Sequence, residues 1–146
     1  MNKTFSSLVA AVLLAIFTGT AAAQDTKPTR ASQNVPELVL GNESGDDFAV
    51  SQTDFELIVG QGYRWQITSH GGKEYKFMAP DFFRNVWMNQ IVIADLEVHM
   101  AGAPAHLEFD DEGTMQVQFH TVRPGEYNWW IEGLEERGMK GKIVIK

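Results

Sequence analysis

The chain of 146 residues contains no cysteine. Disulfide cross-links are therefore excluded, as is every site that needs a thiolate ligand or nucleophile. The common signatures of other catalytic sites are also missing, because there is no Gly-x-Ser-x-Gly, no His-Glu-x-x-His and no phosphate-binding loop. These absences predict that the chain is not an enzyme.

Basic residues are few. Lys and Arg total 12 against 19 Asp and Glu, which gives a formal net charge of −7. A negative chain repels the phosphates of nucleic acids and the headgroups of anionic lipids, so neither is expected as a partner. A metal cation or a protein with a basic surface remains compatible with this charge.

Long hydrophobic runs are confined to the first residues of the chain. Lys3 precedes the apolar stretch from Leu8 to Phe17, and Ala21-Ala22-Ala23 follows it. This order is typical of a secretory signal peptide, so residues 1–23 are predicted to be removed after Ala23. No later run has spanning length, and the mature form is expected to have no membrane span and to be periplasmic or secreted.

The remaining residues predict one all-β domain. Residues 24–36 are polar and contain proline, which indicates a flexible leader before a domain at 37–146. Glycine-marked turns recur about every ten residues within that domain, and this spacing is typical of an antiparallel β-sandwich. Pro80 suits the first position of a helix, so one short helical turn is predicted near 80–84.

Alternating apolar and polar residues indicate which strand faces are buried. Residues 91–100 are predicted to form one strand with Leu96, Val98 and Met100 on its buried face. His99 falls on the polar face of that strand. Residues 114–122 repeat the pattern and place His120 on their polar face. Trp65 and Trp87 are both expected in the core.

Two segments resemble the cupredoxin family, the blue-copper proteins. Near the end of the chain the family pattern is Pro-Gly-x-Tyr, an aromatic pair, a loop and Gly-Met-x-Gly before a last strand, matched here by Pro124-Gly125-Glu126-Tyr127, Trp129-Trp130 and Gly138-Met139-Lys140-Gly141. Upstream, residues 71–83 resemble the segment that carries the first copper-binding histidine. The resemblance covers residues 37–146 and implies a Greek-key β-sandwich of cupredoxin type.

The same resemblance implies that the copper ligands have been lost. The position of the first histidine falls on Lys73, that of the cysteine on Ile131, and that of the second histidine on Leu134 or Glu135. Only the methionine position is kept, as Met139. Type 1 copper needs a thiolate in a His₂Cys plane, so no type 1 copper is expected.

A relocated metal site is one hypothesis for the function. Turns at 101–105 and 110–113 reverse the chain twice, which places His99, His106 and His120 at one end of the sandwich. Imidazoles bind Cu(II) or Zn, and the thioether of neighbouring Met100 suits Cu(I). At the opposite end, residues 110–112 with Glu132, Glu135 and Glu136 are expected to gather around Met139.

Two functions from different classes follow from these patterns. The first is copper or other transition-metal handling by an exported binding protein, through ligands other than the inherited ones. The alternative is a metal-free protein-interaction or structural subunit that keeps the cupredoxin scaffold for its stability. Fold alone does not decide between them.

Overall fold

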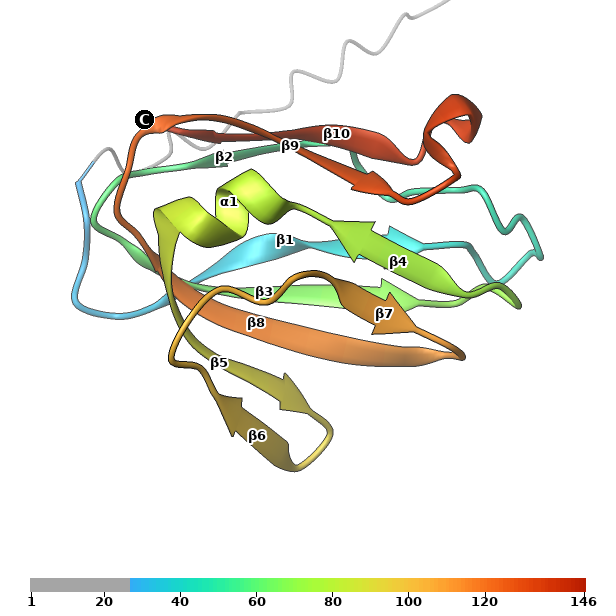
Figure 1. Cartoon of the computed structure of the whole chain (residues 1–146), viewed down its shortest axis with the longest axis horizontal. Coiled ribbons are helices and arrows are strands. Elements are labelled where there is room, and N and C mark those ends of the chain that lie inside the picture. The colour runs from blue at the N-terminus through green and yellow to red at the C-terminus, as the bar shows by residue number, and fades with distance from the viewer. Residues whose placement is uncertain (1–26) are drawn as a thin grey trace, which may run out of the picture.

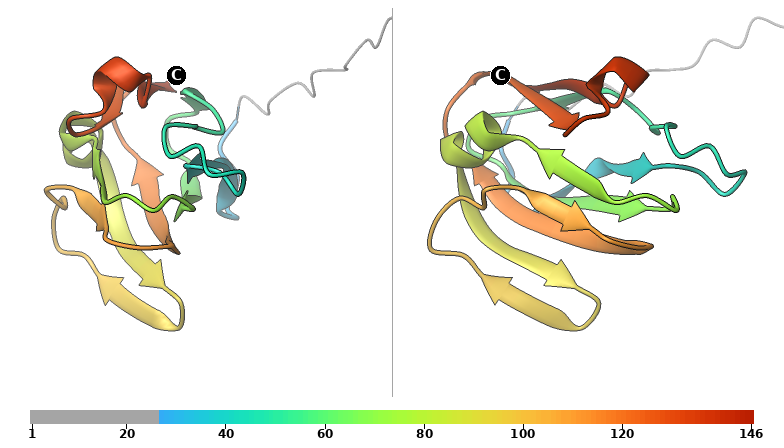
Figure 2. Two further views of the ribbon diagram at one scale, coloured as in Figure 1. Left: turned by 90° about the vertical axis from the view of Figure 1, so that its right-hand side faces the viewer. Right: turned by 45° about the vertical axis from the view of Figure 1, so that its right-hand side comes forward.

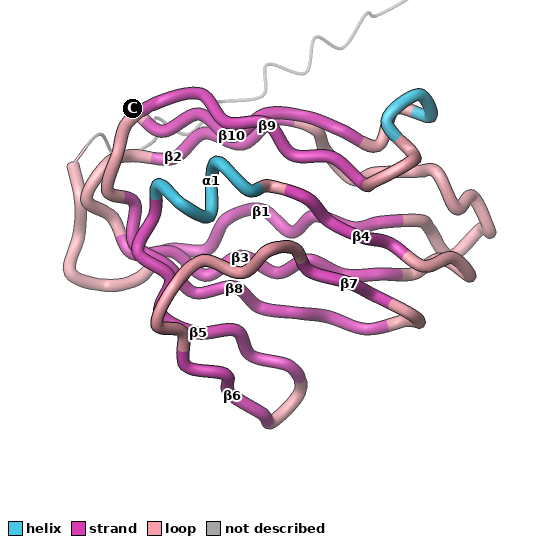
Figure 3. Tube along the Cα trace, in the orientation of Figure 1, coloured by secondary structure: helices cyan, strands magenta, loops and turns pink. Residues whose placement is uncertain are grey.

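The structure, a computed structural model, describes residues 27–146. Two five-stranded sheets pack face to face (Figure 1, Figure 3). Sheet A has the strand order β1 (Gln33–Leu40), β3 (Gly62–Ser69), β8 (Gly113–Thr121), β5 (Val86–Ile93) and β6 (Leu96–His99). Sheet B has the order β2 (Asp54–Leu57), β10 (Lys140–Ile145), β9 (Gly125–Ile131), β4 (Tyr75–Met78) and β7 (Leu107–Phe109). The predicted all-β Greek-key sandwich is confirmed.

The strand pairing is mixed. β1 pairs with β3 in parallel, and β2 pairs with β10 in parallel, whereas the other named pairs are antiparallel. β1 and β2, which make these parallel pairs, are each the edge strand of their sheet, and together they close one side of the sandwich. At the other side the two sheets end unequally, because the β5–β6 hairpin projects beyond β7 (Figure 1, Figure 2).

Aromatic side chains fill the space between the sheets. Trp65, Phe77 and Phe82 pack edge to face, with ring centroids 5.7 and 6.2 Å from Trp65. The indole N–H of Trp65 donates to the Pro36 carbonyl at 3.1 Å, and that of Trp129 donates to the Thr53 carbonyl at 2.8 Å. These bonds satisfy the polar atom of each buried indole, so the rings add apolar burial without an unpaired donor.

Trp65 is in the core as predicted, but the prediction for Trp87 is wrong. The Trp87 side chain is 68% exposed. Its cross-strand partner is His120, which lies on the outer face of β8, and residues paired across a sheet share a face. A register shift between Met88 and Gln90 follows directly, so the alternation along β5 is interrupted where the sequence pattern assumed continuity.

The short helix is where the sequence placed it. α1 spans Pro80–Asn85, with Pro80 at its start, and buries Phe82 and Phe83. It covers one end of the gap between the sheets (Figure 1). The fixed backbone angle of proline favours the first helical turn, and the two phenylalanines anchor it to the core.

The domain begins earlier than predicted. β1 starts at Gln33, so the last four residues assigned to the flexible leader are part of a strand. The buried amide of Gln61 explains the earlier start, because its Oε1 accepts from the Thr29 N–H at 2.6 Å and its Nε2 donates to the Ala31 carbonyl at 2.8 Å. The signal peptide predicted at 1–23 and leader residues 24–26 lie outside the described residues. No helix within 27–146 is both long and apolar enough to cross a bilayer.

The single strand predicted at 91–100 is instead part of a hairpin. β5 ends at Ile93 and β6 begins at Leu96, with a two-residue turn at Ala94 and Asp95 between them. Ala94 has the left-handed φ of 52° that permits so tight a reversal. The reversal carries Leu96 and Val98 away from the core, so they are exposed rather than buried as predicted.

Candidate functional site

The carried-over copper-ligand positions lie at one end of the sandwich, which we call the ligand end and define by Lys73, Ile131, Leu134 and Met139. Ile131 and Met139 are fully buried, and the Ile131 N–H donates to the Met139 carbonyl at 2.9 Å. The Leu134 N–H donates to the Ile131 carbonyl at 2.9 Å, which closes a tight turn between β9 and β10. Apolar side chains therefore occupy the positions that the resemblance assigns to a cysteine and a methionine ligand.

Cations cover an aromatic ring beside the ligand end. The Arg137 guanidinium lies 3.9 Å from the ring centroid of Phe48, and the Lys73 Nζ lies 5.5 Å from it. Phe48 is half-buried and packs against the core from the β1–β2 connection. These contacts join three connections at that end, and they place two positive charges where a copper site would need to attract a cation.

The three histidines of the predicted metal site do not converge. His99 and His120 lie on β6 and β8 of sheet A, with β5 between them, whereas His106 precedes β7 at the edge of sheet B. Each has a different neighbour: His99 Nε2 is 3.4 Å from Glu97, His106 Nε2 is 3.0 Å from Glu108, and His120 Nδ1 is 3.2 Å from the Asn89 amide.

The sequence could not show that His106 lies beside sheet B while His99 and His120 lie on sheet A. Within residues 27–146, the one group of three or more His, Asp or Glu side chains whose ligand atoms could share an ion is Glu74, Glu108 and Asp110. The other two residues of the predicted site do not complete it. Met100 is partly buried against the core, and Met139 is buried at the ligand end.

The carboxylate group lies on the outer side of the β4–β7 pair. Its ligand atoms are within 4.8 Å of one another. The pKa of Glu74 is raised, first by its hydrogen bond with Glu108 and then by the charge of that carboxylate, while the same bond and one with His106 lower the pKa of Glu108. Lys76 adds a positive charge 4.0 Å from Glu108 and 3.2 Å from Glu132.

The Lys76 ammonium thus offsets part of the negative charge of this group. The sequence missed it because β4 and β7 are far apart in the chain, and only their register brings Lys76 opposite Glu108. Asp110 was expected instead beside the acidic residues that follow β9. Of those, Glu132 reaches this surface through Lys76.

The β5–β6 hairpin exposes an apolar face. Ile91 pairs with Val98, and Ile93 pairs with Leu96, so these four side chains share the face of sheet A that elsewhere forms the core. Ile91 is buried, but Ile93, Leu96 and Val98 are 41, 71 and 51% exposed. We call Ile93, Leu96 and Val98 the hairpin face. Sheet B ends at β7 and does not cover it (Figure 1, Figure 2).

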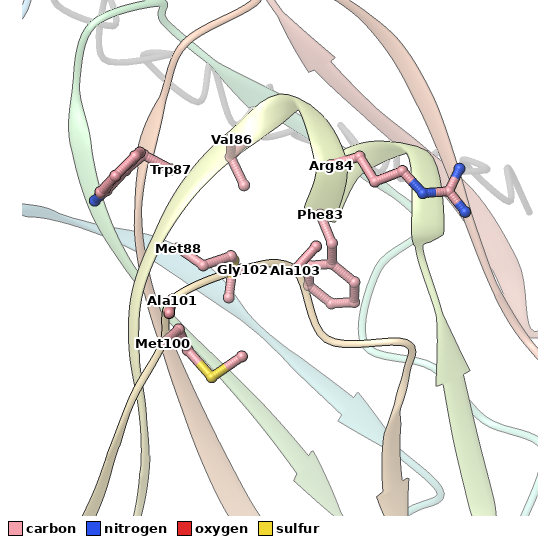
Figure 4. A pocket seen from close by; sticks show the side chains of 9 residues that line it. All are labelled: Phe83, Arg84, Val86, Trp87, Met88, Met100, Ala101, Gly102 and Ala103. Carbon is pink, nitrogen blue, oxygen red and sulfur yellow. The ribbon is translucent and has the colours of Figure 1, made fainter.

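A cavity of about 270 Å³ lies between α1, β5 and the segment that follows β6. Met88, Met100 and Phe83 line it together with the small residues Ala101, Gly102 and Ala103 (Figure 4). Trp87 also borders it, but its ring extends away from the two methionines (Figure 4). Two methionines, a phenylalanine and Arg84 are thus among its lining residues, and none of these residues is a carboxylate.

A second hollow, of about 570 Å³, lies on sheet B beside the half-buried Trp130. Asn128 and Lys142 of the neighbouring β9 and β10 line it with Asp54 of β2. Trp129 and Trp130 face opposite sides of β9, with Trp129 fully buried. Trp130 is thus a partly exposed aromatic side chain on sheet B, the sheet to which the hairpin does not belong.

The comparisons with known proteins show the fold. No family model matches the chain, and no curated protein is similar to it in sequence. Auracyanin A, a "blue" copper protein from Chloroflexus aurantiacus, is 14% identical with a TM-score of 0.51, over 80% of this chain and 100% of that chain. A laccase from Pediococcus acidilactici is 16% identical with a TM-score of 0.59, over 86% of this chain and 29% of that chain. Copper nitrite reductase from Nitrosomonas europaea is 9% identical with a TM-score of 0.53, over 84% and 51%.

These likenesses confirm the cupredoxin fold that the sequence predicted. The chain spans the whole length of the auracyanin but under a third of the laccase. At identities this low the match concerns the arrangement of strands alone.

Proposed function

We propose that this cupredoxin-fold chain is an exported interaction domain that docks another protein chain on its hairpin face and does not transfer electrons through type 1 copper. The observation that carries the proposal is the uncovered apolar face of Ile93, Leu96 and Val98 on a projecting hairpin. Apolar side chains that share one face and lack an intramolecular cover are typical of docking surfaces.

The ligand end supports the second half of the proposal. The chain has no cysteine to supply the thiolate of type 1 copper. Ile131 and Met139 are packed into the core, and Lys73 and Arg137 place positive charge nearby. These packed residues hold the β1–β2, β3–β4 and β9–β10 connections together. We therefore place binding by the domain on the hairpin face instead.

Site-specific cross-linking tests the docking surface. A photoreactive residue replaces Val92, which lies in the same hairpin but on the opposite face of β5. This probe is placed in the wild type and in a double variant that carries Leu96→Lys and Val98→Lys. We expect a cross-linked product of higher mass with the wild type that the double variant loses, because two lysines would have to be desolvated at the interface.

The matched control is Trp130→Ala, which removes a half-buried aromatic side chain from sheet B and should leave the product unchanged. Circular dichroism and the melting temperature establish that both variants fold. Identical products from the wild type and the double lysine variant would refute docking on the hairpin face.

Export has its own test. The proposal requires that a cell retaining its secretion system produce a mature chain starting at Gln24, in its periplasm or medium. Mass spectrometry of the N-terminal peptide measures this directly. An intact N-terminus beginning at Met1 in the cytoplasm would contradict it.

Transition-metal handling is the second candidate function. The specific observation in its favour is that Met88 and Met100 line the same cavity, since thioethers are ligands for Cu(I). Among the proteins that share this fold, the auracyanin is by name a "blue" copper protein and the nitrite reductase a copper enzyme. A metal that binds the native state alone must raise the melting temperature.

Melting curves with Cu(I), Cu(II) and Zn(II) decide this candidate. Three proteins are compared: the wild type, Met88→Leu with Met100→Leu, and His99→Ala with His106→Ala and His120→Ala. A Cu(I) shift lost in the leucine variant locates binding at the cavity, whereas a Zn(II) or Cu(II) shift lost in the alanine variant locates it at the histidines. No shift with any of the three ions would refute metal handling.

A further inference from the structure

We infer that the chain docked on the hairpin is a second copy of this one, paired antiparallel along β6 with Val98 on the two-fold axis. The inference rests on the proposed docking surface and names its partner. It follows from three features of β6: a free backbone edge, a self-complementary order of charges, and an uncovered apolar face.

The free edge is the first feature. Among residues 27–146, β6 is the last strand of sheet A and pairs with β5 alone. The Met100 N–H donates to the Asn89 carbonyl at 2.9 Å, toward β5. Since N–H groups alternate in direction along a strand, those of Glu97 and His99 point to the free edge. An edge with its donors and acceptors unpaired can accept another strand.

The order of charges is the second feature. Side chains alternate in direction, so a second β6 keeps its apolar residues on the hairpin face only in alternate registers. With Val98 opposite Val98 of the second copy, each Glu97 lies opposite a His99 and each Leu96 opposite a Met100. A shift that centres the pair on Glu97 places two carboxylates opposite each other, and one centred on His99 does the same for two imidazoles. Of these three registers, only the one centred on Val98 pairs Glu97 with His99 and places no like charges opposite each other.

The same register uses the free backbone groups. Glu97 and His99 both direct their N–H and carbonyl groups outward, and in this pairing they are the residues that exchange hydrogen bonds across the axis. Each copy contributes two such residues, so the short strand is bonded along its length.

The apolar face is the third feature. Pairing at β6 places Leu96 and Val98 of both copies side by side on one surface, between the two B sheets. Leu96 is 71% exposed in the single chain and has no apolar cross-strand neighbour other than Ile93. In the pair it gains Met100 of the second copy, so the side chains most exposed to water are the ones that association covers.

The charge order allows a test that a different dimer would not pass. Glu97→Lys and His99→Glu are made as separate variants. Each should disfavour its own dimer, because the first places lysine opposite histidine and the second places carboxylate opposite carboxylate. Mixed together, the two variants restore opposite charges at both positions, so they should prefer each other. Sedimentation velocity over a concentration series at pH 6, where histidine side chains carry charge, measures all four samples.

We expect the wild type to shift from one to two chains per particle as concentration rises. Two like-charge contacts should raise the dissociation constant of each variant about tenfold, and the equimolar mixture should return it to the wild-type range. Glu43→Lys, which makes the same charge change on the exposed β1–β2 connection, is the matched control and should behave as the wild type. Circular dichroism confirms that every variant folds.

Two results would overturn the inference: a wild type that stays a single chain at all concentrations, or a dimer that neither Glu97→Lys nor His99→Glu weakens. The proposed function would survive the first result if the cross-linked product at the hairpin contained a different protein. If the hairpin variants also left every cross-link unchanged, the inference and the proposed function would both fail.

Discussion

The ligand end and the hairpin face both contain apolar side chains, but these side chains are buried at the ligand end and exposed at the hairpin face. At the ligand end, Ile131 and Met139 are fully buried, and Phe48 lies under Arg137 and Lys73. At the hairpin, Leu96 and Val98 are more than half exposed although they share the face that forms the core. The difference lies in coverage: sheet B and three connections close one region, and nothing in the described residues closes the other. One cupredoxin fold can therefore close one end with packed side chains and leave an apolar sheet face open elsewhere.

Removing a side chain from each region should give the largest contrast. Ile131→Ala opens a cavity in a fully buried position and should lower the free energy of unfolding by about 2–5 kcal/mol. Leu96→Ala removes an exposed side chain and should change it by about 0.5 kcal/mol or less at concentrations where the chain is single.

Urea denaturation of both variants beside the wild type measures the two costs, and an unchanged denaturant slope shows that the comparison is sound. Similar losses for Ile131→Ala and Leu96→Ala would mean that the hairpin face is covered within the single chain. The contrast between the two regions would then disappear.

The cations at the ligand end give the next effect in size. Phe48→Leu keeps an apolar side chain but removes the ring faced by Arg137 and Lys73, and should cost about 1–2 kcal/mol of unfolding free energy. Arg137→Gln alone should cost less, since it removes one of the two contacts. If the double variant costs as much as the two single variants added together, the guanidinium and the ring do not interact, and their proximity stabilises nothing.

The sequence was enough to predict the buried face of strands whose apolar and polar residues alternate regularly and whose apolar face is covered by the other sheet. The alternation of Val117 and Phe119 with Gln118 and His120 correctly separates the two faces of β8, and Pro80 correctly marks α1. The paired cupredoxin motifs correctly predicted the fold, because their residues hold the last strands in the core.

Three features could not be predicted, each for a physical reason. The β5–β6 reversal occurs at Ala94 and Asp95, where alanine in a left-handed conformation gives no glycine signal. The start of β1 depends on the buried amide of Gln61, thirty residues away from the Ala31 carbonyl that it binds. The relation between the histidines depends on which sheet each strand joins, and turns alone specify direction but not the sheet.

Ala94 offers a way to strengthen the hairpin without touching its face. A non-glycine residue at a φ of 52° bears about 1–2 kcal/mol of strain that glycine does not, and glycine loses about 0.5–1 kcal/mol more backbone entropy on folding. Ala94→Gly should therefore raise the free energy of unfolding by about 0.5 kcal/mol. Ala101→Gly, at an ordinary φ in the segment after β6, is the control and should lower it. A loss of stability in Ala94→Gly would show that the turn is not strained.

The smallest effect is expected at the carboxylates beside β4, which lie outside both regions. The hydrogen bond with Glu108 raises the pKa of Glu74, and the same bond lowers the pKa of Glu108. A raised folded pKa means that the contribution of Glu74 to stability is present at low pH and is lost as the pH rises through that value. The contribution of Glu108 has the opposite sign and is lost as the pH falls through its lowered value.

The variant Glu74→Gln distinguishes the contribution of Glu74 to stability from that of Glu108. The glutamine amide can still donate to Glu108, so the Glu108 carboxyl should keep a pKa below its ordinary value, while the titration of Glu74 with its raised pKa disappears. Because Glu74 no longer carries a charge, stability should fall less between pH 4 and pH 7 in this variant than in the wild type. Carbon-detected NMR titration of the carboxyl groups follows each one directly. A Glu108 carboxyl that returns to its ordinary pKa in Glu74→Gln would show that charge, rather than the donated hydrogen bond, sets its titration.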